Sequence, residues 1–253
     1  LGDVYKRQIQ VTVETPEGEI ITQIRHIEST GADYDKLNYL NAMSRYVCSH
    51  NPDEKELVRR FKKVMARPDQ SELITGLAQI TGGTAFAVFF GCDLQDAVVA
   101  LIVCLMIVLV GRWLSRREGN PMIYNLILAF LSEVVIVTAV RSGLGHHPDR
   151  IMIGIVMLLV SALGAINGMR DVMQRNFISG SLEVMNSMLG AFGIAFGIAL
   201  AMMLMGNISA EGFDVNNNTV IQLISCTIGC TGYASWFKIC LLYTSDAADD
   251  LIG

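Results

Sequence analysis

The densest set of polar residues inside the apolar part of the sequence is the stretch NGMRD, with Asn167, Arg170 and Asp171. On a helix, residues three and four positions apart share a face, so these three side chains can reach one site. A guanidinium beside a carboxylate suits a zwitterionic or carboxylate ligand. A plainer interpretation is a charged anchor with an internal salt bridge at the end of an apolar span. Spacing alone favours the anchor, and both interpretations stay open.

Other polar residues stand alone in apolar surroundings. Glu133 lies within LAFLSEVVIV, and Asn125 lies two turns earlier on the same helical face. Glu183 and Asn186 lie near the start of a later apolar block. Charged groups are costly in a bilayer, so each marks a candidate functional site. We expect Glu133 and Glu183 to be ion or proton sites, with Asn125 and Asn186 as supporting polar groups.

Patterns typical of enzymes are missing from the sequence, which has no phosphate loop, no HExxH motif and no supported Ser/His/Asp set. His146 and His147 stand beside Asp149, and we expect a solvated pair there. The sequence therefore predicts a protein that is not an enzyme and that has no cofactor and no metal site.

The elements that position these residues follow from the composition. The chain is 52% hydrophobic and 17% charged, with a mean hydropathy of +0.44, whereas soluble domains are about 25% charged. Residues 9–67 are polar and rich in charge, and apolar blocks begin near Leu73. The net charge of −5 gives no indication of nucleic-acid binding. We expect a mostly α protein, a polytopic helical membrane bundle preceded by a small α+β domain.

About six apolar blocks have the roughly 20 residues that a bilayer requires. We place them at 72–91, 95–114, 121–141, 150–168, 178–205 and 218–239. Their flanks carry eleven Lys and Arg residues on one side and two on the other. Because basic residues favour the cytoplasmic side, the N-terminal domain is predicted to be cytoplasmic.

The N-terminal domain is predicted to contain a hairpin and two helices. Val11 and Val13 share a strand face, a turn with Gly18 follows, and 20–27 is the second strand. A helix follows from Asp33, and another begins with Asn51 as its cap and Pro52 as its first helical residue. Isolated hairpins are marginally stable, so further strands are expected upstream.

Two long stretches of the chain have a recognisable pattern, IRHIESTGADYDKLNYLNAMSRYVC and the part from PDRIMIGIVMLLVSALGAINGMRD to LGAFGIAFGIALAM. They resemble the threonine/serine exporter family, and the resemblance covers nearly all of residues 9–206. It implies a cytoplasmic domain, five spans, and a second five-span half that is fused or separate. TVIQLISCTIGCTGYASWFKI resembles the first span of that half, which favours the fused form.

The most specific part of the resemblance is the fourth-span ending with Asn167, Arg170 and Asp171, followed by Ser179 and Gly180. We expect these residues to contact substrate or to gate. Family members usually have Pro-Gly at 161–162 and Gly-Asp at 175–176, where this chain has Ser-Ala and Arg-Asn. A Pro-Gly pair breaks a helix and exposes backbone groups, so its loss is expected to remove that break.

The resemblance implies a multi-pass secondary transporter of the bacterial inner membrane that exports small amino acids and is driven by an ion gradient. Relatives are also associated with dicarboxylate export, and a membrane scaffold or sensor is a further alternative. The expected partners are the bilayer, a small-molecule substrate and the second five-span half. A homo-oligomer stays open, and no nucleic acid is expected.

The two ends of the chain read as sequencing-adapter codons. Codons for CLLYTS match the DNA of a transposase end that is used to make fragment libraries for sequencing. Codons for LGDVYKRQ contain the reverse complement of the same DNA end. We therefore expect a metagenomic fragment. Its expected parts are adapter at 1–8 and 240–253, a truncated cytoplasmic domain at 9–70, five spans at 71–206, and an outer loop with the next span at 207–239.

Overall fold

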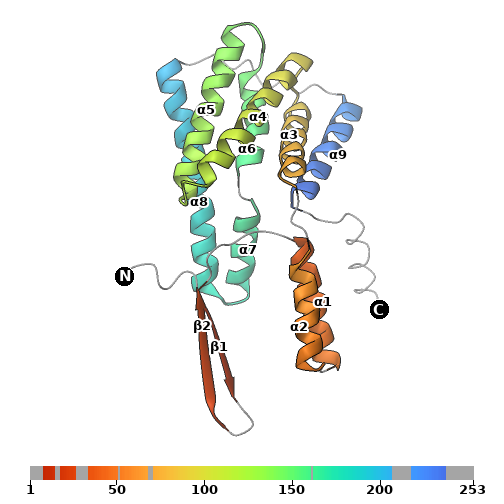
Figure 1. Ribbon diagram of the computed structural model, residues 1–253. Coiled ribbons are helices and arrows are strands. Elements are labelled where there is room, and N and C mark those ends of the chain that lie inside the picture. The colour runs from red at the N-terminus through yellow and green to blue at the C-terminus, as the bar shows by residue number, and fades with distance from the viewer. Residues whose placement is uncertain are drawn as a thin grey trace. The chain divides into compact units, whose positions relative to one another are not determined.

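The computed structural model describes residues 8–14, 18–26, 34–50, 52–67, 71–160, 162–206 and 218–237. Nine helices and two strands make up these described residues, so the mostly helical fold is confirmed (Figure 1). The chain divides into two compact units, Leu1–Arg67 and Pro68–Gly253. Each unit is described by itself below.

The first unit contains the predicted hairpin. Strands β1 (Gln8–Glu14) and β2 (Ile20–His26) pair antiparallel, with Thr12 opposite Thr22 and their hydroxyl oxygens 3.2 Å apart. Gly18 has a φ of +80°, the left-handed conformation that glycine adopts most readily. Gln8, which the codons assign to adapter, is the first residue of β1 and pairs with His26. The other proposed adapter residues, 1–7 and 240–253, lie outside the described part.

Two helices complete this unit, α1 (Tyr34–His50) and α2 (Glu54–Met65). The predicted cap of α2 was wrong, because the helix starts after Asp53, whose carboxylate accepts the Glu54 N–H at 2.9 Å. Asn51 lies outside the described residues. On α2 the Arg60 side chain hydrogen-bonds Glu56, which holds the pKa of that carboxyl below its usual value.

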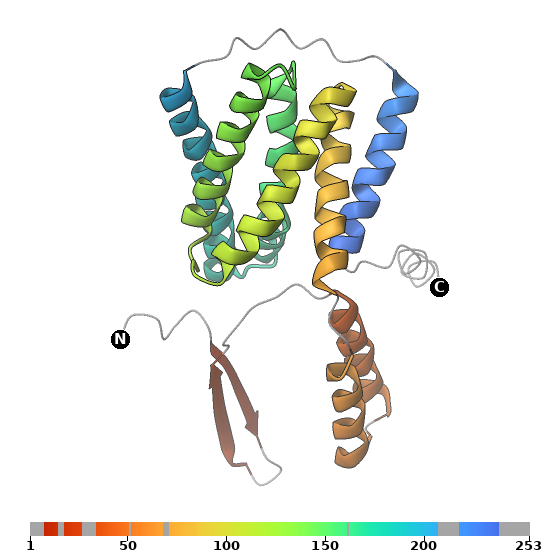
Figure 2. The same ribbon diagram turned by 45° about the horizontal axis from the view of Figure 1, so that its top comes forward.

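The second unit is a bundle of helices. Its elements are α3 (Glu72–Phe89), α4 (Leu94–Ser115), α5 (Pro121–Arg141), α6 (Pro148–Leu159), α7 (Ala162–Met173), α8 (Phe177–Met205) and α9 (Thr219–Trp236). Helix α5 packs along α8, α3 lies between α9 and the α4–α6 pair, and α7 packs against α8 (Figures 1 and 2). Its core holds side chains of α4, α5 and α6 that are almost fully buried, such as Val103, Leu128 and Ile155.

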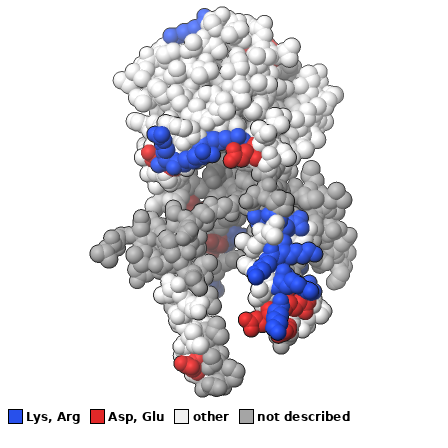
Figure 3. Space-filling model, in the orientation of Figure 1, with Lys and Arg blue, Asp and Glu red and all other residues white. Residues whose placement is uncertain are grey.

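Three of these helices, α4, α5 and α8, are long and apolar enough to cross a membrane, and the bent pair α6–α7 makes a fourth candidate. Large apolar side chains on them face outward, for example Leu109 and Phe192. Figure 3 shows a face of this unit that is nearly free of charged side chains except near its ends. Helices α3 and α9 have 18 residues each and fall outside that set. The count of six spans stays a prediction.

The span predicted at 150–168 is not one helix. It is broken between α6 and α7, whose axes differ by 51°. Helix α6 ends where Val160 adopts an extended conformation, and the Val160 N–H still bonds to the Val156 carbonyl. The expectation that the break would be lost without Pro-Gly is therefore wrong. Val160 leaves the helical φ/ψ region, so α6 ends there although no proline follows it.

Glycines bring neighbouring backbones together in this unit, because small residues let helices approach closely. A Cβ atom at Gly193 would lie 2.3 Å from the Met122 carbonyl oxygen, and one at Gly197 would lie 2.5 Å from that of Leu126. The α5–α8 interface is thus in backbone contact at both glycines.

Candidate functional site

Glu133 is the one acidic residue of α5, and it is buried, with 3% of its surface exposed. Its Oε2 atom has no hydrogen-bond partner in the described part of the chain. Leu126 and Ala129 of α5 lie against Gly197 of α8. Glu133 follows them by seven and four residues, so helical periodicity puts it on the same face of α5, toward α8. A buried carboxyl group without a partner is costly unless it gains a proton or a cation.

Asn125 is also buried, and its role is visible. Its side-chain amide donates to the Gly190 carbonyl of α8 at 3.3 Å. Close approach at Gly190 makes this possible, since a Cβ there would lie 3.0 Å from Asn125 Nδ2. Asn125 therefore ties α5 to α8 two turns before Glu133.

The three polar residues of NGMRD all lie on α7, but the structure does not bring them to one cavity. Asn167 and Arg170 are exposed, and Asp171 is half-buried. Arg170 lines an open groove of about 490 Å³ whose other lining residues are Ala165, Ile166, Met169, Met173 and Gln174. Among the described residues, no ion pair joins Arg170 to Asp171, so the predicted internal salt bridge is not seen.

Gly180 on α8 has a packing role in the structure. A Cβ atom there would lie 2.6 Å from the Gly168 carbonyl oxygen, which holds α7 and α8 together as a tight helical hairpin. Ser179, Glu183 and Asn186 are exposed on α8, the first directly before Gly180 and the other two after it. The predicted site residues therefore divide into a buried pair on α5 and a group on α7 and α8 that is exposed except for half-buried Asp171 and buried Gly180.

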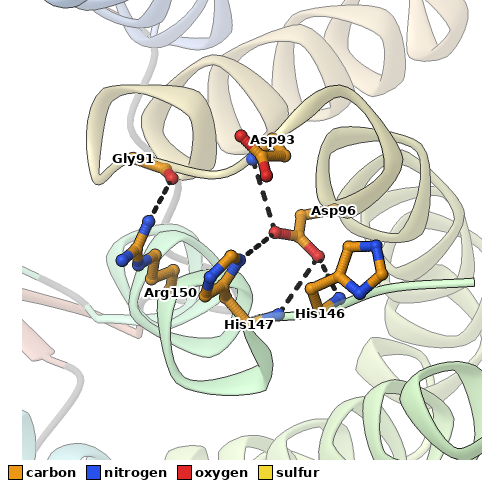
Figure 4. Close-up of polar contacts among 6 residues, drawn as sticks. All are labelled: Gly91, Asp93, Asp96, His146, His147 and Arg150. Carbon is orange, nitrogen blue, oxygen red and sulfur yellow. Dashed lines mark hydrogen bonds and ion pairs between the residues drawn. The ribbon is translucent and has the colours of Figure 1, made fainter. Parts of the chain in front are cut away.

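A second polar cluster, which the sequence did not reveal, joins the start of α4 to the start of α6 (Figure 4). Asp96 is fully buried, and its Oδ1 accepts the backbone N–H groups of His146 at 2.7 Å and of His147 at 3.3 Å. Its Oδ2 lies 2.9 Å from His147 Nδ1 and accepts the Asp93 N–H at 3.3 Å. Both oxygens of the carboxylate are thus engaged.

The expectation of two solvated histidines is half wrong. His146 is exposed, whereas the His147 side chain is 17% exposed and contacts Asp96. Only the Asp93–Asp96 capping box at the start of α4 is a local signal, whereas the contact of Asp96 with His147 joins residues 51 positions apart. The ligand atoms of Asp93, Asp96 and His147 lie within 4.8 Å of one another, so these three residues could hold a metal ion.

Two neighbours complete the surroundings of this cluster. Arg150 donates to the Gly91 carbonyl at 2.8 Å and fixes the turn between α3 and α4 to α6. Burial raises the pKa of the Cys92 thiol to about 12, so this cysteine stays protonated at neutral pH. These contacts hold the start of α4 and the turn before it against the start of α6, which is a structural role.

The comparisons with known proteins give one match. The family model ThrE, described as "Putative threonine/serine exporter", matches residues 3–205. The chain belongs to this family. No curated protein and no solved structure matches the chain.

The range matched by the ThrE family can be compared with the elements and site residues of the chain. All predicted site residues, from Asn125 to Asn186, lie within the matched range, whereas α9 lies beyond it. A family of exporters together with several long apolar helices indicates a multi-pass membrane protein of a transporter class, in agreement with a role other than catalysis. The match begins at Asp3, within the eight residues ascribed to adapter sequence, and that assignment stays a prediction.

Proposed function

We propose that this chain is part of a secondary transporter that exports small amino acids of the threonine/serine type across the bacterial inner membrane, driven by an ion gradient. The observation that carries the proposal is Glu133, a buried carboxyl with an unpartnered oxygen in the helical unit of a ThrE family member. An intramembrane acid of this kind can take up a proton or a cation on one side and release it on the other.

Substrate recognition is assigned to the α7–α8 hairpin. A zwitterionic amino acid offers a carboxylate that Arg170 can bind, and an ammonium group that Asp171 can bind. Asn167 and Ser179 supply neutral hydrogen-bonding groups on the same two helices, and Gly180 fixes the hairpin. Glu183 and Asn186 extend the polar group along α8, with Glu183 as a second ion candidate.

The remaining parts of the transporter follow the family pattern. We assign the N-terminal unit to the cytoplasm and expect a second five-span half to pack beside this one in the bilayer. The apolar side chains exposed on α7 and α8, such as Ile166 and Met188, suit lipid or that second half. A homo-oligomer would be compatible with the same surface.

The test is efflux from vesicles that contain the full-length protein and labelled threonine, serine or succinate. We expect an ion gradient to accelerate the efflux of threonine or serine. Glu133→Gln keeps the size of the side chain and removes its charge, so it should lower gradient-driven efflux to the level of protein-free vesicles. Glu118→Gln, the same chemical change in the turn between α4 and α5, is the matched control and should leave efflux unchanged.

Three outcomes would contradict the proposal. Gradient-driven efflux of succinate alone would make the chain a dicarboxylate exporter. No efflux of any of the three compounds would favour a scaffold or sensor. Full efflux by Arg170→Ala and Asp171→Ala variants that insert normally would remove these residues from the substrate site.

A further inference from the structure

The broken span is held at its break by a side chain from outside the matched family range. Helix α6 ends at Leu159, so Met157 lies in its last turn, where carbonyl groups lack partners within the helix. The Tyr233 hydroxyl of α9 donates a hydrogen bond to the Met157 carbonyl. A tyrosine on one helix therefore caps the broken end of another.

Glycines on α3 and α9 make this contact possible. A Cβ atom at Gly232 would lie 2.9 Å from the Cα of Gly82, so the two backbones touch. The Tyr233 ring then lies over Gly82, where a Cβ would be 3.2 Å from the ring. It packs edge-to-face on Phe86, with the ring centroids 5.4 Å apart.

The neighbouring face of α3, about 100° around the helix, holds α6 in reach of that hydroxyl. A Cβ atom at Gly154 would lie 2.6 Å from the Cα of Ala87, and one at Gly83 would lie 3.4 Å from the Leu158 side chain. Helices α9 and α6 therefore pack on neighbouring faces of α3. Tyr233 reaches past it to the carbonyl two residues before the end of α6.

We propose that Tyr233 is a positioning residue that maintains the 51° bend between α6 and α7 by binding the Met157 carbonyl. The bend decides where α7 lies, and α7 carries Asn167, Arg170 and Asp171. Helix α9 thereby becomes part of the working unit, although the family match ends before it. The link from this bend to transport rests on the proposed function, whereas the bend itself can be measured independently.

The bend can be measured as a distance between two spin labels. Leu144 precedes α6 and Met173 ends α7, and both side chains are exposed, so cysteines at these positions can carry the labels. Each 12-residue helix is about 18 Å long, so straightening a 51° bend lengthens the pair by about 3 to 4 Å. The labels are placed in the full chain, reconstituted in vesicles, with its native cysteines replaced by alanine.

Tyr233→Phe keeps the ring on Phe86 and removes only the hydroxyl. We expect the distance distribution to extend toward longer values by about 3 to 4 Å. The loss of one hydrogen bond should change the ratio of bent to straight molecules about fivefold. Tyr124→Phe removes a hydroxyl from α5 and should leave the distribution unchanged.

The outcomes separate this inference from the proposed function. An unchanged distribution in Tyr233→Phe, or an equal change in Tyr124→Phe, would overturn it. A longer distance together with slower efflux and an altered KM supports both proposals. A longer distance in a protein that moves no substrate at all supports the role of Tyr233 and rejects the transport proposal.

Discussion

At the scale of single residues, two buried acids in this chain have opposite surroundings. Asp96 and Glu133 are both almost completely buried. Asp96 accepts three backbone N–H groups and contacts an imidazole, whereas an oxygen of Glu133 has no partner among the described residues. A satisfied carboxylate stabilises the joint between two helices. A carboxylate without such partners is stabilised by a proton or a cation, which is why we propose Glu133 as the ion or proton site.

Arg175 gives a prediction at this scale. It has a φ of +68° in the turn between α7 and α8, a conformation that glycine adopts most readily. The left-handed conformation costs a residue with a side chain about 1 to 2 kcal/mol, and glycine loses about 0.5 to 1 kcal/mol in chain entropy. Arg175→Gly should therefore raise the free energy of unfolding by about 0.5 to 1 kcal/mol. Unfolding in detergent micelles measures it.

The control for this prediction is Arg175→Ala, which removes the charge and keeps the strained backbone. It should not stabilise the protein. Equal stabilisation by both variants would show that the charge of Arg175, and not its backbone conformation, is responsible.

At the scale of helices, the α5–α8 pair depends on glycine. A Cβ atom at Gly193 would lie 2.3 Å from a backbone oxygen of Met122, which cannot move aside without moving α5. Gly193→Ala should therefore separate the two helices and lower the free energy of unfolding by about 1 to 3 kcal/mol. It should also weaken the Asn125–Gly190 hydrogen bond one turn away. Thermal unfolding of the purified protein measures the change.

Gly119→Ala is the matched control, because a Cβ atom there meets nothing within 4 Å. It should leave the unfolding temperature unchanged within error. Loss of stability in the control but not in Gly193→Ala would mean that the close approach of α5 and α8 does not stabilise the fold.

The helices also show where sequence reasoning succeeds. Apolar length predicted α4, α5 and α8, and alternation with a turn glycine predicted the hairpin, because both signals are local. The break between α6 and α7 was missed, since Ser161 and Ala162 carry no local signal for it. Its geometry depends on a hydrogen bond from Tyr233, 76 positions from Met157 along the chain. Likewise, Asp96 and His147 meet only after two helices pack.

At the scale of the whole molecule, hydropathy and packing make different demands on the same helix. Helix α3 is rich in glycine, alanine and threonine, and α9 in glycine, serine, cysteine and threonine. The buried residues of both helices are small, such as Gly82 and Gly232. Such residues lower hydropathy but let backbones approach closely, which stabilises helix contacts in lipid. This is why the number of spans cannot be read from apolar length alone.

The number and direction of spans together determine the orientation of the chain, which gives the last prediction. If six spans run as predicted, Cys48 on α1 lies in the cytoplasm and the loop with Leu144 lies outside, because basic residues favour the cytoplasmic side. In a cysteine-free chain, Leu144→Cys should react with a membrane-impermeant maleimide in intact cells. Cys48, restored alone and exposed on its helix, should react only after permeabilisation. Labelling of Cys48 alone in intact cells would show the reverse orientation. Labelling of both cysteines in intact cells would show that an even number of spans separates them.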